Sequence, residues 1–68
     1  MDYKISMAAA RVNAGLTQSD VASRMRISKA TVVSWERGYV MPKLAQFKLF
    51  CEICSVPEDL ICLPRNLK

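Results

Sequence analysis

Apolar residues recur at intervals of three and four through most of the chain, a spacing that predicts amphipathic helices. The clearest stretch is residues 17–38, where two such patterns are separated by a short break. The first pattern opens at Thr17, a candidate N-cap, and Asp20 follows three residues later, as in an acidic form of the capping box. Its apolar face consists of Val21, Ala22 and Met25.

The second pattern opens at Ser28, another candidate N-cap, and closes at Gly38, a residue type that commonly ends helices. Val32 and Trp35 form its inward stripe, and Trp35 is expected to be the central large apolar group because it is the only tryptophan. Two helices joined by a three-to-four-residue turn form a helix-turn-helix, whose second helix can be offered to the major groove of DNA.

The segment before this stretch predicts a first helix over residues 3–14, which Gly15 ends. Two different faces of that helix are compatible with the apolar spacing. One consists of Tyr3, Met7, Ala10 and Ala14, and the other of Ile5, Ala8 or Ala9, and Val12. Periodicity alone does not decide which of them faces the core.

After the motif, a helix is expected over about 43–54, with Pro42 suited to its first turn. Its expected core face consists of Leu44, Phe47, Phe50, Cys51 and Cys54. Leu49 and Ile53 lie off that face and are surplus apolar groups.

A last short helix is expected over about 57–63, with Leu60 and Ile61 as its core candidates, and residues 65–68 are expected to fray. No run of sufficient length shows the alternation of apolar and polar residues that is typical of a β-strand. The patterns therefore predict a single all-α domain over residues 1–68, built as a bundle of five short helices.

In the two helices of residues 17–38 and in the segments that flank them, the chain resembles the Cro/CI-type helix-turn-helix regulators of phages and bacteria. The residues that carry the resemblance are Leu16, Thr17, Gln18, Ala22, Ile27, Ser28, Val32, Trp35, Glu36, Arg37, Gly38 and the run from Ser55 to Leu60. The resemblance implies a lambda-repressor-like bundle with the helix-turn-helix as its second and third helices, and it favours the Met7 face of the first helix as core. The chain departs from the family at Arg26, where a glycine is common; a single left-handed residue is tolerated in turns.

The resemblance also implies an ion pair between Arg11 of the first helix and Glu36 near the end of the second motif helix. Both residues are present at matching positions. A bidentate pair would fix the angle between the two helices, whereas two independent surface charges would contribute little. We expect the pair, and we expect its role to be structural.

The net charge of +4 and the pI of about 9.3 are in the direction expected for a partner that carries phosphates. A soluble basic domain would explain the charge alone equally well. No apolar run approaches the roughly 20 residues that span a bilayer, and the first residues lack the features of a signal peptide. We therefore expect a cytoplasmic protein with no membrane partner, in a bacterial cell or a phage-infected host.

The sequence contains no histidine, no glycine-rich phosphate loop and no carboxylate pair in an apolar setting, so we expect neither an enzyme nor a cofactor. Cys51 and Cys54 have the spacing of a metal or redox pair but stand alone, and no metal site is expected. We expect these two cysteines and Cys62 to be buried, reduced and structural.

Binding to a double-stranded DNA operator requires anchors to the phosphates and readers of the base edges. Gln18 fits an anchor at one end of the motif, and Arg37 and Lys43 fit the other end. The other DNA-binding candidates lie at the start of the second motif helix and are Ser28, Lys29, Ala30, Thr31, Val33 and Ser34. Among them Lys29 can reach guanine acceptors, and the apolar groups can meet thymine methyl groups.

The leading function is therefore transcriptional regulation by sequence-specific DNA binding. The reading face has no Gln, Asn or Arg, however, and it is partly apolar. The alternative function is that of an antirepressor or modulator, which uses this surface to bind a phage repressor protein. The surface consists of Ala30, Val33, Tyr39, Val40 and Met41. A homodimer is expected through the C-terminal helices, at Leu49, Ile53 and Leu63.

Overall fold

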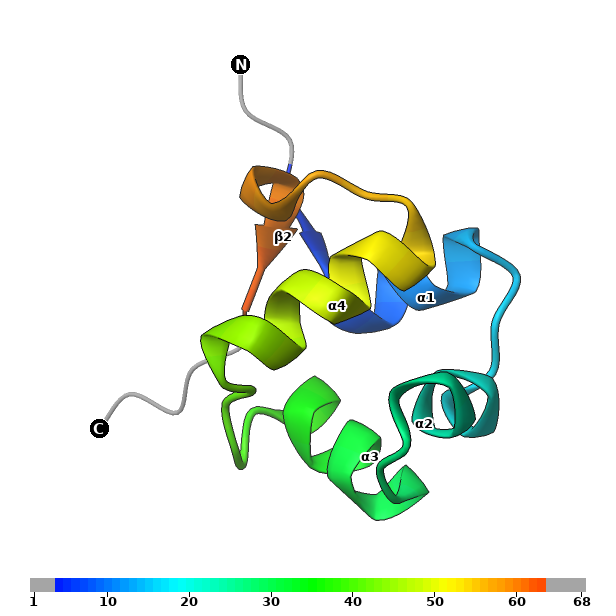
Figure 1. The fold of residues 1–68 in the computed structure, drawn as a ribbon. Coiled ribbons are helices and arrows are strands. Elements are labelled where there is room, and N and C mark those ends of the chain that lie inside the picture. The colour runs from blue at the N-terminus through cyan, green and yellow to red at the C-terminus, as the bar shows by residue number, and fades with distance from the viewer. Residues whose placement is uncertain (1–3, 64–68) are drawn as a thin grey trace.

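The computed structural model describes residues 4–63, which form four α-helices, one short 3-10 turn and two very short strands (Figure 1). The elements in chain order are β1 (Ile5–Ser6), α1 (Met7–Asn13), α2 (Gln18–Met25), α3 (Lys29–Arg37), α4 (Leu44–Cys54), the 3-10 turn η1 (Glu58–Leu60) and β2 (Ile61–Cys62). Helices α2 and α3 pack against each other at one end of the molecule, and the strands lie at the other end.

The core lies between the four helices and is closed at one end by β2. Its buried residues are Met7, Ala10, Val21, Ala22, Met25, Val32, Trp35, Phe50, Cys51, Cys54 and Ile61. Trp35 is the largest fully buried side chain of the described residues, as the sequence predicted. No polar or charged residue among those described is buried, so the free energy of this core comes from apolar contacts.

The first helix begins later than predicted, at Met7 and not at residue 3. Ser6 is its N-cap, because the Ser6 hydroxyl accepts a hydrogen bond from the backbone N–H of Ala9 at 3.0 Å. Met7 and Ala10 are buried, which confirms the face that the family resemblance favoured, but Ala14 is exposed. Tyr3, the remaining member of that face, lies outside the described residues.

The predicted last helix over 57–63 is wrong, so the described residues form four α-helices and not five, in a mostly helical domain with a small two-stranded sheet. Residues 58–60 form only η1, and β2 then pairs in parallel with β1, with Ile5 opposite Ile61. This pairing buries Ile61 and leaves Leu60, the other core candidate, 39% exposed. The backbone bonds to a distant segment outweigh the weak local preference for one helical turn. The predicted frayed tail, residues 65–68, lies outside the described residues.

The bounds of helix α4 agree with the prediction, but some of its residues that face the core differ from those predicted. Lys43 is its N-cap residue, with its backbone N–H donating to the Gln46 side-chain oxygen at 2.9 Å, so Pro42 precedes the helix and does not lie in its first turn. Leu44 was expected in the core and is 67% exposed. Ile53, expected to be surplus, packs partly against the core.

The cysteines divide into two groups. Cys51 and Cys54 are buried and unpaired, as predicted, and burial raises the pKa of both thiols. Cys62 is exposed on β2, so the prediction that it is a buried structural residue is wrong. The same strand pairing that replaced the last helix explains this, because neighbouring strand residues point to opposite faces and Ile61 takes the inward one.

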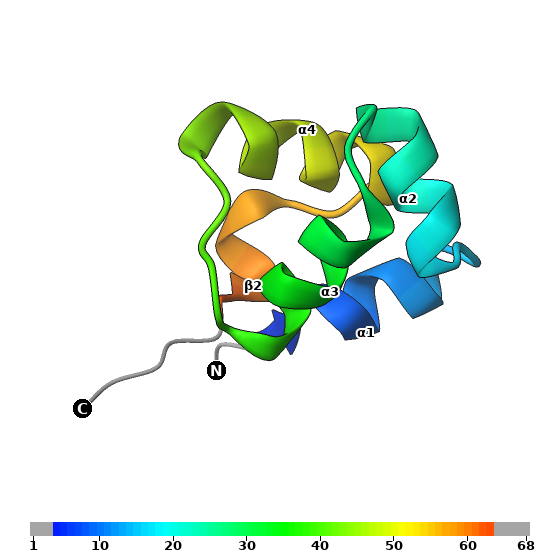
Figure 2. The ribbon, with the colours of Figure 1, turned by 90° about the horizontal axis from the view of Figure 1, so that it is seen from below.

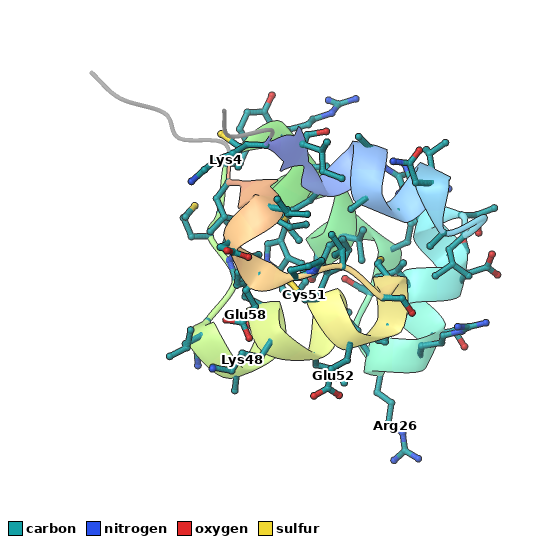
Figure 3. All side chains as sticks on the ribbon, turned by 90° about the horizontal axis from the view of Figure 1, so that it is seen from above. Lys4, Arg26, Lys48, Cys51, Glu52 and Glu58 are labelled. Atoms are coloured by element: carbon teal, nitrogen blue, oxygen red, sulfur yellow. The ribbon has the colours of Figure 1, made fainter. Side chains whose placement is uncertain are left out.

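Helices α2, α3 and α4 end with a C-cap residue in the left-handed region, at Arg26, Gly38 and Ser55, and in α1 the left-handed residue is Gly15, which follows the cap. Arg26 has φ 59°, and the N–H of Ile27 closes the helix on the carbonyl of Ala22 at 3.0 Å. This is the Schellman arrangement that glycine usually forms. The chain therefore keeps the tight turn without the glycine, and the Arg26 side chain extends away from the body of the molecule (Figure 3).

Candidate nucleic-acid interface

Helices α2 and α3 form the predicted helix-turn-helix, and α3 lies on the outer side of the molecule that faces the viewer in Figure 2. The start of α2 carries the predicted capping box. The Thr17 hydroxyl accepts from the Asp20 N–H at 3.0 Å, and the Asp20 carboxylate accepts from the Thr17 N–H at 2.8 Å. The bonds from the backbone and then from the hydroxyl of Thr17 lower the pKa of Asp20.

The start of α3 is fixed by Ser28, whose hydroxyl accepts from the Thr31 N–H at 3.1 Å. The two hydroxyls of Ser28 and Thr31 are also hydrogen-bonded to each other at 2.9 Å. Both predicted contact residues therefore take part in the cap. Only one of the two hydroxyls donates in the bond between them, so the other keeps an O–H that it can donate to a further acceptor.

The outer side of α3 holds the other predicted reading residues. Lys29 and Ala30 are exposed in the first turn, while Val33 and Ser34 are only half-exposed. The inward side is occupied by buried Val32 and Trp35. Access to solvent therefore falls from the start of α3 toward its middle, and the lysine at the start has the longest reach.

The predicted phosphate anchors come from the start of α2, the end of α3 and the start of α4. Gln18 is the first residue of α2 and is half-buried. Arg37 is the last residue of α3, Lys43 is the cap residue of α4, and both are exposed. The loop between α3 and α4 thus brings two cations to the end of α3 that is opposite the Ser28 cap.

A partly buried ion pair fixes α3 against α1, as the family resemblance implied. The Arg11 Nε atom lies 2.7 Å from Glu36 Oε2, and Arg11 Nη2 donates to Glu36 Oε1 at 3.3 Å. The side chains of Arg11 and Glu36 are only 14% and 7% exposed. Because the guanidinium and the carboxylate meet in a two-point fork, the pair sets both the distance and the angle between the helices.

Two further bonds of this cluster were not predicted. Arg11 Nη1 donates to the carbonyl of Leu16 in the loop between α1 and α2, at 2.9 Å. The Gln18 Nε2 atom donates to Glu36 Oε1 at 3.0 Å. The sequence indicated only a DNA contact for Gln18, although a carboxylate can accept more than the two hydrogen bonds of one arginine.

The predicted apolar partner surface is split by the structure. Tyr39, Val40 and Met41 are exposed in the loop after α3, and exposed Leu44 adjoins them. Ala30 lies at the other end of α3, eight residues before Gly38 and therefore about 12 Å away along the helix axis. The exposed apolar groups consequently gather at the α3–α4 loop and not over the reading face.

Within residues 4–63 no group of three or more His, Cys, Asp or Glu side chains is placed to hold a metal ion. No helix in that part of the chain is long and apolar enough to cross a membrane.

A family model described as Helix-turn-helix matches residues 7–61, which is more than half of the chain and includes the four helices. Neither the curated proteins nor the solved structures gave a match. The chain therefore belongs to the Cro/CI-type helix-turn-helix family of DNA-binding regulators.

Proposed function

We propose that this protein regulates transcription by binding a specific double-stranded DNA operator, in the manner of a small phage or prophage Cro/CI-type regulator. One observation carries the proposal: α3 lies on the outer side of the molecule, with Trp35 buried behind it and Lys29 exposed at its start. A helix whose inner face packs against the core and whose outer face is exposed to solvent can enter a major groove without unfolding.

The proposed pose places phosphate anchors on both sides of the groove. Gln18 and the first backbone amides of α2 meet one strand, because the N-terminus of a helix presents free N–H groups and a partial positive charge. Arg37 and Lys43 meet the other. These contacts set the register of α3 and carry little sequence information.

Base reading is assigned to the first turns of α3. Lys29 donates to guanine O6 or N7, and Ser34 takes a second polar contact. Ala30 and Val33 meet thymine methyl groups, while Ser28 and Thr31 contact DNA through hydroxyls that also hold the helix cap. Because strong bidentate readers are absent, we expect modest discrimination between sequences.

The test is a titration of the protein on duplex DNA from around its own gene, at several salt concentrations. Arg37→Ala and Lys43→Ala should weaken binding and each reduce the slope of log affinity against log salt by about one. Lys4→Ala is the matched control, since Lys4 is an exposed cation that precedes β1, at the opposite end of the molecule from α3 (Figure 1). Unchanged affinity and slope for both Arg37→Ala and Lys43→Ala would contradict the pose.

A second candidate function is binding of another regulatory protein, with the repressor of a phage as the specific partner proposed. The observation that favours it is the run of exposed apolar side chains at the α3–α4 loop, of which Tyr39 is 67% exposed. Burying such groups contributes about 25 cal/mol per Å² of apolar area. Arg37 and Lys43, two of the proposed phosphate anchors, flank this loop, so a protein bound there would exclude DNA.

A matched pair of substitutions tests this second function. Val40→Asp places a charge in the loop surface, and Val12→Asp places the same charge on exposed α1, away from it. Val40→Asp should abolish association with the repressor encoded beside this gene, because the charge would be buried unpaired. Val12→Asp should leave it unchanged. Equal association of both variants would exclude the loop as the contact.

A homodimer through the C-terminal end remains a proposal. Of its three residues, Leu49 is exposed, whereas Ile53 and Leu63 already pack partly against the core. The contact would therefore centre on α4 and not on a last helix. Leu49→Lys should lower the fraction of dimer measured by sedimentation without lowering the thermal stability of the monomer.

A further inference from the structure

The side chain of Gln18 donates a hydrogen bond to the largely buried carboxylate of Glu36. Its Nε2 atom donates to Glu36 Oε1 at 3.0 Å, and the same carboxylate accepts both bonds of the Arg11 fork. Glu36 is near the end of α3 and Gln18 is the first residue of α2, so the bond joins the two helices of the motif at the edge of the proposed DNA face. Arg11 alone balances the negative charge of Glu36, so the neutral Gln18 side chain adds a hydrogen bond and no charge neutralisation.

The chemistry of the two groups fixes which way the amide of Gln18 points. An ionised carboxylate only accepts hydrogen bonds, so the nitrogen of the amide, and not its oxygen, must face Glu36. A flipped amide would place the carbonyl oxygen against the carboxylate and lose the bond. The amide nitrogen carries a second hydrogen that Glu36 Oε1 does not use, and this hydrogen is left for another acceptor.

A DNA phosphate is such an acceptor, and it too can only accept. We infer that Glu36 is a positioning residue for DNA binding, which orients the Gln18 amide so that its second N–H meets a backbone phosphate. The inference rests on the proposed DNA-binding function. The Thr17 hydroxyl takes the Asp20 backbone N–H, so it is the earlier amides of the first turn of α2, beside Gln18, that favour an anion at the same place.

The orientation also has an entropic consequence. A glutamine that is free in solution must give up rotamer freedom when it binds a phosphate, and long side chains lose the most. The bond to Glu36 already restricts the Gln18 side chain before DNA arrives. The anchor is therefore preorganised, and the contact strengthens binding more than a free glutamine would.

A double-mutant cycle tests the inference, with DNA affinity measured at a temperature where every variant is folded. Gln18→Ala should weaken binding by about tenfold, the loss expected for a hydrogen bond to a charged group. Glu36→Gln keeps the size of the side chain but can donate as well as accept, so it no longer fixes the amide; it should weaken binding by a few-fold. In the Gln18→Ala background Glu36→Gln should cause a smaller loss than in the wild type, because only the effect of the weakened Arg11 pair on α3 remains. Additive losses would overturn the inference.

A second measurement uses the wild-type protein and does not depend on how the variants fold. The chain has only two glutamines, and their amides are held in opposite ways: Gln18 donates through nitrogen, whereas Gln46 accepts through oxygen from the Lys43 N–H. In an NMR spectrum of the side-chain amides, Gln18 should show one strongly shifted proton in the free protein. Addition of DNA should then move its other proton. A freely rotating Gln18 amide, or one that DNA does not affect, would overturn the inference.

The outcomes separate this inference from the proposed function. If Arg37→Ala weakens DNA binding and Gln18→Ala does not, DNA binding stands and the role of Glu36 through Gln18 is wrong. If no variant of these anchors changes DNA affinity, the proposed function itself fails.

Discussion

The Nε atom of Arg11 lies 2.7 Å from Oε2 of Glu36, and this pair connects α1 with the end of α3 across 25 residues of sequence. Since both side chains are almost fully shielded from water, the pair is not a surface salt bridge of small value. Arg11 also donates a hydrogen bond to the Leu16 carbonyl, so one guanidinium connects α1, the following loop and α3. The orientation of the proposed recognition helix depends on this one side chain.

Removing Arg11 should destabilise the protein strongly. In Arg11→Ala the Glu36 carboxylate stays buried without its charged partner, which typically costs about 3–5 kcal/mol. Arg24→Ala is the control, because Arg24 is exposed on α2 and such substitutions usually change stability by no more than about 0.5 kcal/mol. Thermal unfolding followed by circular dichroism measures both. Similar melting temperatures for the two variants would contradict the structural role of the pair.

Replacing Arg26 with glycine should stabilise the protein. The left-handed backbone at φ 59° costs a residue with a Cβ about 1–2 kcal/mol, and glycine would relieve this strain. Part of the relief is offset because glycine has more conformational freedom in the unfolded chain. We expect a net gain of about 0.5–1 kcal/mol, or a melting temperature several degrees higher. Arg24→Gly makes the same chemical change inside α2, where glycine should instead cost about 1 kcal/mol. A destabilised Arg26→Gly variant would show that the arginine side chain has an unrecognised role.

The capping box should make stability depend on acid. The pKa of Asp20 in the folded protein lies below its usual value of 3.8, so its stabilising contribution is present above that value and is lost as the pH falls through the lowered pKa. Urea unfolding between pH 2 and pH 6 should therefore show a smaller acid loss in Asp20→Asn than in the wild type. Thr17→Ala should lower stability by about 1 kcal/mol but keep much of the pH dependence, since the Thr17 backbone N–H remains. An unchanged acid profile in Asp20→Asn would argue against the box.

The three cysteines should react differently with iodoacetamide under native conditions. Cys62 is exposed and should be alkylated quickly at pH 8. Cys51 and Cys54 are buried, and burial raises the pKa of their thiols, so they should react only when the protein unfolds. Mass spectrometry of digested protein locates the label. Rapid labelling of Cys54 in the folded protein would contradict its place in the core.

The helix-turn-helix was predictable because its signals are local. Thr17 and Ser28 cap the two helices, Gly38 ends the second, and each bond spans only a few residues. Trp35 was identified by its size and its place in the helical repeat. Where neighbouring residues decide the conformation, the sequence pattern was sufficient.

The ends of the domain were not predictable in the same way. Ile5 and Ile61 pair across 56 positions, and neither has a local pattern that indicates a strand. Leu44 fits the helical repeat of the core face but lies in the first turn of α4, where it is left in water. The bond from Gln18 to Glu36 likewise depends on how α2 and α3 cross, which the spacing of apolar residues does not specify.

The central claim is that the first turns of α3 enter a DNA groove. It is tested most directly by recording backbone amide NMR spectra while a duplex from around the gene is added at low salt. The largest shifts should fall on residues 28–34, the start of α2 and Lys43, with little change at β1 and β2. Shifts confined to the strands, or to the loop at Tyr39–Met41 with none in α3, would contradict it.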